Sequence, residues 1–105
     1  MTISVSKQFT DTPGGRKRQD GMFSGEEFRE SFLEAEFAPG KQEIIEVDLD
    51  GCEGFATAFL EEVFGGLARQ FGSEAVGKRI KIISTDEPLL VDEVERYIRN
   101  ANRKA

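Results

Sequence analysis

The chain has 105 residues, which is enough for one domain with a single hydrophobic core and leaves no room for a second. It contains no histidine and only one cysteine, Cys52; this composition excludes a serine–histidine–aspartate triad, a histidine-ligated metal and an internal disulfide. Twenty acidic against fourteen basic side chains give a formal charge of -6, an unfavourable balance for binding nucleic acid.

The acidic side chains are concentrated in the middle of the chain. From Glu26 to Glu62 there are twelve acidic and two basic side chains, a net charge of -10, while the rest holds eight acidic and twelve basic, a net charge of +4. Such a segment is either a solvated face or a docking surface for a partner.

Nothing in the sequence predicts export or membrane insertion. Met1 leads into the chain without the basic flank and long apolar core of a leader peptide. No stretch approaches the roughly 20 apolar residues that span a bilayer. With an unpaired cysteine as well, we expect a cytoplasmic protein that makes no membrane contact.

The first third of the chain predicts a strand, a loop and a helix. Apolar and polar residues alternate over residues 2–9, which is typical of a strand with one covered face. Turn residues follow at 11–15 and again at 20–21, and a short strand could lie between these turns or just after them.

The helix after these turns has a well-defined start. Ser24 is placed to cap it, and Glu27 three residues later completes a capping box. Phe23 and Phe28 are spaced for a hydrophobic staple across that cap. Pro39 with the following glycine ends the helix.

Two further strand–helix pairs follow. Residues 43–49 form a second apolar strand, after which Thr57 can cap a helix over residues 57–71. Residues 79–84 form a third strand, and Thr85 or Asp86 can cap a last helix. This order implies at least partly parallel pairing. We expect one α/β domain over residues 1–105, with a mixed sheet of about four strands and three main helices.

Two positions in the third pair are unusual for structure alone. Gly65 and Gly66 lie inside a strongly periodic helix, where each glycine costs about 1 kcal/mol relative to alanine. They indicate either tight packing inside the protein or close approach by a partner or ligand. Thr57 follows a strand that ends in Asp-Leu-Asp-Gly, so a phosphate on it would lie at a positive helix end. The simpler interpretation is that Thr57 is only a cap.

The basic loop, which runs from Pro13 to Arg18, offers a different interpretation. Gly14, Gly15 and Arg16 could cradle an anion, which would make the chain a small-ligand or nucleotide sensor. The spacing fits neither of the two common nucleotide-binding motifs. An exposed turn is the alternative, and Arg16 could equally reach the acidic segment as a structural salt bridge.

Enzyme chemistry is not expected. Glu61 and Glu62 are neighbours on a helix and diverge by about 100°, so they do not converge on one site. Asp48 and Asp50 share one side of a strand and could meet a hard cation, but no further ligand has the required spacing. Cys52 has acidic neighbours and no histidine to activate it. We therefore expect no catalytic residue, no metal and no cofactor.

One run of residues also resembles a known family. Asp-Leu-x-Gly at residues 48–51, followed by Phe59-x-x-Glu62-x-Phe64-Gly65-x-Leu67, is similar to the STAS-like domain of unknown function. The upstream matches, Pro13-Gly14-x-Arg16 and Asp20-Gly21-x-x-Ser24-Gly25-Glu26-x-Phe28, extend the resemblance over about residues 3–100.

The resemblance implies a partner-binding role. STAS domains of bacterial anti-sigma factor antagonists are small, non-catalytic α/β proteins that switch partners. A kinase of the GHKL ATPase type phosphorylates a serine or threonine at the start of the helix after their central strand. The STAS-like family tends to have serine where this chain has Ala58, which leaves Thr57 as the candidate phosphoacceptor.

We therefore expect a non-catalytic regulatory protein–protein interaction module whose partner is a GHKL-type ATPase or another regulator. The alternative is the small-ligand or nucleotide sensor, and self-association as a homodimer stays open. The expected partner-binding surface is the start and outer side of the helix over residues 57–71 together with the loop over residues 50–56. Its residues are Asp50, Gly54, Phe55, Thr57, Glu61, Glu62, Gly65 and Gly66.

Overall fold

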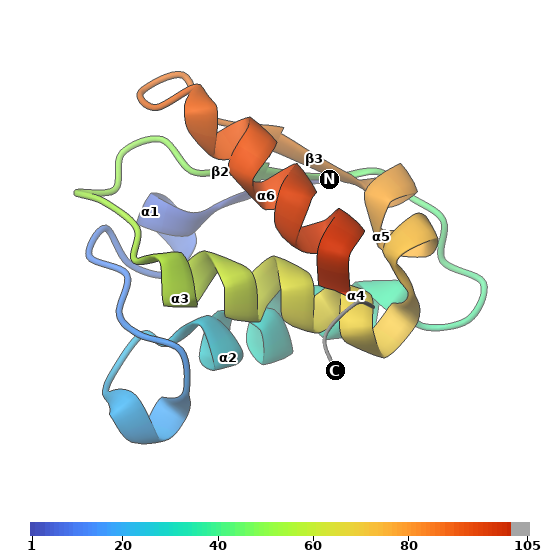
Figure 1. The fold of residues 1–105 in the computed structure, drawn as a ribbon, viewed down its shortest axis with the longest axis horizontal. Helices are drawn as coiled ribbons and strands as arrows, with labels where there is room; N and C mark the ends of the chain where they lie inside the picture. Colours follow the sequence, from blue (N-terminus) through green and yellow to red (C-terminus); the bar gives the residue numbers. More distant parts are fainter. Residues whose placement is uncertain (102–105) are drawn as a thin grey trace.

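Three parallel strands form the sheet in the computed structural model, which describes residues 1–101 (Figure 1). The strands are β1 (Thr2–Ser4), β2 (Ile45–Asp48) and β3 (Ile80–Ile83), and they lie side by side in that order. The register pairs Ile3 with Val47 and Val47 with Ile82.

The helical segments form five helices between and after the strands. Helix α1 (Val5–Gln8) follows β1 directly. The second helix begins as α2 (Gly25–Phe28) and continues through a π-helical segment (Arg29–Leu33) and a 3-10 segment (Glu34–Phe37). The third consists of α3 (Thr57–Leu60), a π-helical segment (Glu61–Gly65) and α4 (Gly66–Phe71). The last two are α5 (Ser73–Arg79) and α6 (Leu89–Asn100). A short 3-10 turn (Arg18–Asp20) begins at the end of the basic loop.

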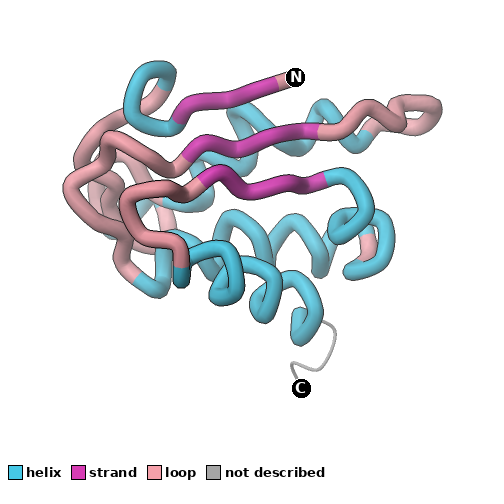
Figure 2. Tube along the Cα trace, turned by 90° about the horizontal axis from the view of Figure 1, so that it is seen from above, coloured by secondary structure: helices cyan, strands magenta, loops and turns pink. Residues whose placement is uncertain are grey.

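The helices lie on one side of the sheet. Figure 2 looks onto the opposite face, over which no helix of the described residues passes. The inward side chains of the strands, among them Ile3, Val47 and Ile80, are buried, whereas Thr2 and Glu46 on the open face are exposed. The strands therefore keep the apolar-in, polar-out alternation of a two-layer fold.

The long helix α3–α4 runs through the middle of the helical layer. Its inward side chains recur at three- and four-residue spacing and are almost fully buried: Phe59, Leu60, Val63, Phe64 and Leu67. At the start of α2, Phe9 packs edge-on against both Phe23 and Phe28, with ring centroids 5.4 and 5.3 Å away. Phe9 therefore contacts both of the rings, Phe23 and Phe28, that were expected to form the hydrophobic staple.

The sheet differs from the prediction in two ways. It has three strands among the described residues, and all of them are parallel, so the expected mixed sheet of about four strands is wrong. The predicted strand over residues 2–9 stops at Ser4, because Ser4 caps a helical turn by accepting a hydrogen bond from the Lys7 N–H. Val5 and Phe9, four residues apart, fit a helical turn as well as a strand, which made the pattern ambiguous.

Two other segments were also mispredicted. Residues Arg18–Asp20 form a 3-10 turn, in the stretch where the sequence left a short strand open. Helix α5 was missed because only Val76 of its seven residues is buried, so the segment carries no apolar periodicity. None of the helices formed by residues 1–101 combines the length and the apolar character needed to cross a membrane.

The helix caps were predicted with mixed success. Ser24 caps α2 and accepts a hydrogen bond from the Glu27 N–H at 3.1 Å, as expected. Thr57 is the first helical residue of α3 and not its cap; the cap position is held by Ala56, which offers no side-chain acceptor. Pro88 holds the cap position of α6, so neither Thr85 nor Asp86 does.

Candidate functional site

Two loops at the carboxyl ends of the strands are joined by Asp50. Its Oδ1 accepts hydrogen bonds from the backbone N–H groups of Thr85 at 2.7 Å and Asp86 at 2.8 Å, in the loop after β3. Asp86 makes the reciprocal contact, because its Oδ2 accepts from the Gly51 N–H at 3.1 Å. Each loop therefore supplies both a carboxylate and a backbone donor, and these three hydrogen bonds join the two loops. We call them the Asp50 clamp.

The same hydrogen bonds keep Asp50 ionised. The bond from the Asp86 N–H lowers the pKa of Asp50 below its ordinary value, and the bonds from Thr85 add to the effect. Ser6 donates to the Asp50 carbonyl oxygen at 3.1 Å, and Asp48 accepts from the Asp50 N–H at 2.9 Å. Asp50, expected to contact a partner, is therefore engaged in holding the loops in place.

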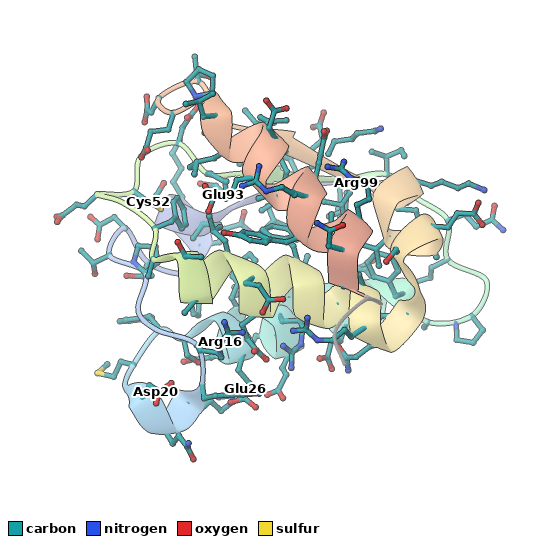
Figure 3. The ribbon with its side chains drawn as sticks, in the orientation of Figure 1. Arg16, Asp20, Glu26, Cys52, Glu93 and Arg99 are labelled. Atoms are coloured by element: carbon teal, nitrogen blue, oxygen red, sulfur yellow. The ribbon has the colours of Figure 1, made fainter. Side chains whose placement is uncertain are left out.

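Thr57 lies exposed beside a tyrosine–glutamate pair. Tyr97 of α6 donates to the Glu93 Oε2 at 2.5 Å, and the Thr57 side chain lies close to the Tyr97 phenol. Burial and the Glu93 carboxylate raise the pKa of Tyr97 to about 12, so this phenol stays protonated and donates. Figure 3 shows Glu93 and Arg16 on opposite sides of helix α3.

The edge around these loops is acidic and carries one prominent apolar side chain. Residues 48–57 and 84–93 together hold seven carboxylates and no lysine or arginine. Leu89, the first residue of α6, is 80% exposed. We call these two segments the acidic edge. At the carboxyl ends of parallel strands, such a surface is a natural binding position.

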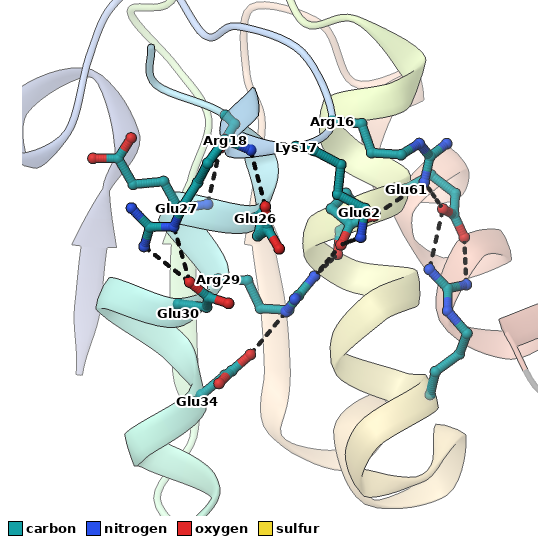
Figure 4. Close-up of polar contacts among 12 residues, drawn as sticks. Arg16, Lys17, Arg18, Glu26, Glu27, Arg29, Glu30, Glu34, Glu61 and Glu62 are labelled. Atoms are coloured by element: carbon teal, nitrogen blue, oxygen red, sulfur yellow. Dashed lines mark hydrogen bonds and ion pairs between the residues drawn. The ribbon is translucent and has the colours of Figure 1, made fainter. Parts of the chain in front are cut away.

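A second cluster of charges lies on the other side of α3, within the protein. Arg29 and Glu62 are buried, and Arg29 donates to the Glu62 carboxylate at 2.5 Å and to its carbonyl oxygen at 2.9 Å (Figure 4). Lys17 and Arg16 each reach the same carboxylate at 3.3 Å. Burial opposes ionisation of Glu62, but the Arg29 and Lys17 donors outweigh it and lower the pKa. We call this group, with Glu61, the ion-pair cluster.

Glu61 extends the cluster toward the surface. Its carboxylate accepts from Arg16 at 2.5 Å and from Arg69 at 2.7 Å. Burial acts to raise the pKa of Glu61, but the Arg69 and Arg16 donors lower it to about 2. Both partners of the central pair, Arg29 and Glu62, lie in π-helical segments, which are wider than ordinary helix turns.

The two helical glycines make room for this cluster. A side-chain Cβ at Gly66 would lie 2.5 Å from the Arg29 Nη1, and one at Gly65 would overlap the Glu61 carboxylate. Gly25 on α2 lets the two helices meet, since a Cβ there would lie 2.6 Å from the Phe59 carbonyl oxygen. Tight internal packing therefore explains both glycines in the long helix. Glu62, Gly65 and Gly66 are buried and are not part of its outer side, where the sequence analysis placed them.

The basic loop is likewise used internally. The Gly14 N–H donates to the Phe23 carbonyl at 2.9 Å, and the Gly15 carbonyl accepts from the Gly25 N–H at 2.9 Å. Arg16 is paired with Glu61 and Glu62, so its alternative interpretation as a structural salt bridge is correct. An anion approaching Gly14, Gly15 and Arg16 would have to displace these carboxylates.

Neither metal nor thiol chemistry is indicated by the described part of the chain. Residues 1–101 hold no group of three or more metal-ligating side chains that could bind an ion. Burial, Asp11 and Asp48 raise the pKa of Cys52 to about 11, which keeps the thiol protonated.

Of the remaining predicted site residues, Gly54 and Phe55 lie in the loop leading to Thr57. A Cβ at Gly54 would meet open space, and Phe55 packs against Phe59 with ring centroids 5.7 Å apart. Sequence reasoning missed Asp86 and Leu89 as parts of this surface. The pairing of the loops depends on the strand order, which no local pattern specifies.

This architecture defines a small α/β domain with a three-stranded parallel sheet and helices on one of its faces. The model of the family described as a STAS-like domain of unknown function matches residues 24–90, and the chain belongs to that family. The match begins at the Ser24 cap and includes both the ion-pair cluster's Glu62 and the Asp50 clamp. Neither curated proteins nor solved structures match the chain.

Proposed function

We propose that this chain is a non-catalytic regulatory module that binds a protein partner through the acidic edge. The observation that carries the proposal is Leu89, which is 80% exposed beside loops that hold seven carboxylates and no cation. An apolar anchor within a charged rim is typical of a protein-binding surface. The Asp50 clamp supports this role, because a preorganised surface loses less entropy on binding.

The negative charge of the acidic edge indicates the charge expected on the partner's binding surface. A surface with a complementary basic patch would be attracted over long range, and its association would slow as salt is added. The partner we propose is a GHKL-type ATPase or another regulator that presents such a patch. This choice draws on the family's likeness to anti-sigma factor antagonist domains.

Phosphorylation of Thr57 would regulate this binding. The Thr57 side chain is exposed, and a phosphate on it would add about -1.5 to -2 charges beside Glu93. Glu61 and Glu62 would oppose that charge little, because Arg16, Arg29 and Arg69 already neutralise them. The change in charge would therefore be confined to the acidic edge.

The test is copurification of the partner from the native cell, followed by binding of the purified pair. We expect Leu89→Ser to weaken binding at least tenfold, as truncation of an anchor usually does. Met22→Ser is the matched control, because Met22 is 76% exposed but lies just before α2, outside the acidic edge. Equal binding by both variants, or the absence of a GHKL-type ATPase or other regulator among copurifying proteins, would contradict the proposal.

A further inference from the structure

Strand β3 ends the sheet on one side, and helix α6 continues beyond it. A groove of about 490 Å³ runs between them, with helix α5 at one end. Figure 2 shows the helix that leads to the C-terminus on the far side of β3 from β2. The apolar side chains that line the groove come from β3 and α6: Ile80, Ile82, Val91, Val94 and Ile98.

The backbone of β3 faces this groove at Ile82. The Leu49 N–H of the chain segment after β2 donates to the Ile83 carbonyl at 2.8 Å, so Ile83 faces β2. Because successive residues of a strand present their backbone groups to opposite edges, Ile82 presents both its N–H and its carbonyl to the groove. The Ile80 N–H donates to the Val76 carbonyl of α5 and is therefore not available to an added strand. The Ile80 carbonyl faces the groove, as the backbone groups of Ile82 do.

The side chains show that the sheet is incomplete here. Ile82 is paired with Val47 in the register and points, like it, toward the helical layer. Val47 is fully buried, whereas Ile82 is only partly buried because no strand formed by residues 1–101 lies beyond it. Val91 of α6 is also only partly buried. One more strand at this edge would cover both side chains.

Side chains on the open face of the sheet indicate which charge an added strand should carry. Thr2, Glu46 and Lys81 lie in register across the three strands, and the Thr2 hydroxyl donates to the Glu46 carboxylate at 2.7 Å. Lys81 is the exposed outer member of this row. Since opposite charges on neighbouring strands attract, an acidic side chain is the favoured next neighbour.

We propose that this groove receives a fourth strand from another protein. Its chemistry would be an extended segment with aliphatic residues at alternating positions, facing α6, and an acidic residue beside Lys81. A second copy of this chain fits less well, because a two-fold axis would bring its own α6 under the same strands. The groove runs along the side of the sheet and shares only Val91 with the acidic edge, which lies at the carboxyl ends of the strands.

Amide exchange and a designed peptide test this proposal. In the free protein we expect the Ile82 N–H to exchange faster than those of Lys81 and Ile83, which face β2. The probe is a nine-residue peptide that alternates valine with threonine and carries glutamate at one polar position. We expect it to protect the Ile82 N–H, and the same peptide with a central proline to have no effect.

Charge reversal gives the matched variants. We expect Lys81→Glu to weaken binding of the glutamate peptide about tenfold and to improve binding of the corresponding lysine peptide. Lys7→Glu makes the same charge change on exposed α1 and should leave both affinities unchanged. Val91→Lys, in the groove, should abolish binding of either peptide.

Three results would overturn the proposal. The first is an Ile82 N–H that stays unprotected in saturating peptide. The second is equal protection by the proline peptide. The third is a dimer, seen by sedimentation, in which raising the protein concentration alone protects the Ile82 N–H; this would assign the groove to a second copy.

Discussion

Arg29 and Glu62 form an ion pair within the helical layer, joined both through the Glu62 carboxylate and through its carbonyl oxygen at 2.9 Å. Arg29 is 8% exposed and Glu62 is 4% exposed. A charged pair at this depth is stable only while both partners are present, because the desolvation of each charge is offset by the other. This pair explains why the helix carries a glutamate among its buried apolar residues.

Removing one partner of this pair should strongly destabilise the fold. We expect Glu62→Ala to lower the free energy of unfolding by about 3–5 kcal/mol, since the buried Arg29 would lose its buried counterion and keep only the partly exposed Glu34. The double variant Arg29→Met with Glu62→Met should cost less than the single variant, because it removes both buried charges, and the former partners Lys17 and Glu34 are partly exposed to water. Urea titration measures both. Glu30→Ala removes the exposed Arg18–Glu30 pair as a control and should cost less than about 1 kcal/mol. Equal costs at positions 30 and 62 would contradict this account.

Gly66→Ala should destabilise the protein, although alanine normally favours a helix by about 1 kcal/mol over glycine. The added Cβ would lie 2.5 Å from the Arg29 Nη1, and Arg29 is held by Glu62 and Glu34. We expect a loss of about 1–3 kcal/mol, as for overpacking of a core.

Gly77→Ala provides the matched comparison on α5. Its Cβ would find no heavy atom closer than 3.9 Å, so this variant should gain about 0.5–1 kcal/mol. Thermal denaturation of both variants is the measurement. A Gly66→Ala protein that is stabilised like Gly77→Ala would show that Arg29 can move aside freely.

Acid should destabilise the protein through Glu61. In the folded state its pKa is lowered from 4.5 to about 2, so the folded protein binds this proton less readily than the unfolded chain. The stabilisation is therefore complete above about pH 4.5 and is lost as the pH falls toward 2. It amounts to on the order of 1–2 kcal/mol, since the side chain is partly in contact with water. Glu61→Gln should flatten the pH dependence of stability in this window, and an unchanged slope would refute the assignment.

The sequence predicted the elements that carry strong local signals. The Ser24 cap, the long helix ending at Gly72 and the apolar strands around Val47 and Ile82 all lie where the pattern placed them. These signals depend on neighbouring residues alone. Helix α5 lacked such a signal, because its one buried residue defines no apolar face.

The candidate site was harder to predict, because its key contacts join distant segments. Asp50 meets Thr85 and Asp86 thirty-five and thirty-six residues away, and this contact exists only because β2 and β3 are neighbours. The same limit applied to Glu62, whose counterion Arg29 is thirty-three residues away. An acidic residue in a helix predicts exposure until its buried partner is known.

The Asp50 clamp should be visible in amide exchange. We expect Asp50→Ala to speed exchange of the Thr85 and Asp86 N–H groups, because both lose their acceptor. Asp50→Asn keeps an acceptor oxygen and should show a smaller effect. Glu53→Ala changes an exposed carboxylate in the same loop and is the control. If the exchange rates of Asp50→Ala match those of the control, the loops are held together by other contacts.

Thr57 and Ala56 offer a test that separates capping from function. Because the α3 cap position belongs to Ala56 and has no side-chain acceptor, Thr57→Ala should change the free energy of unfolding by less than about 0.5 kcal/mol. Ala56→Ser supplies the missing acceptor and should stabilise the protein by about 0.5–1 kcal/mol. Denaturant titration distinguishes the two positions. A loss of 1 kcal/mol or more in Thr57→Ala, with no gain in Ala56→Ser, would restore Thr57 as the cap and remove one reason to regard its hydroxyl as free for phosphorylation.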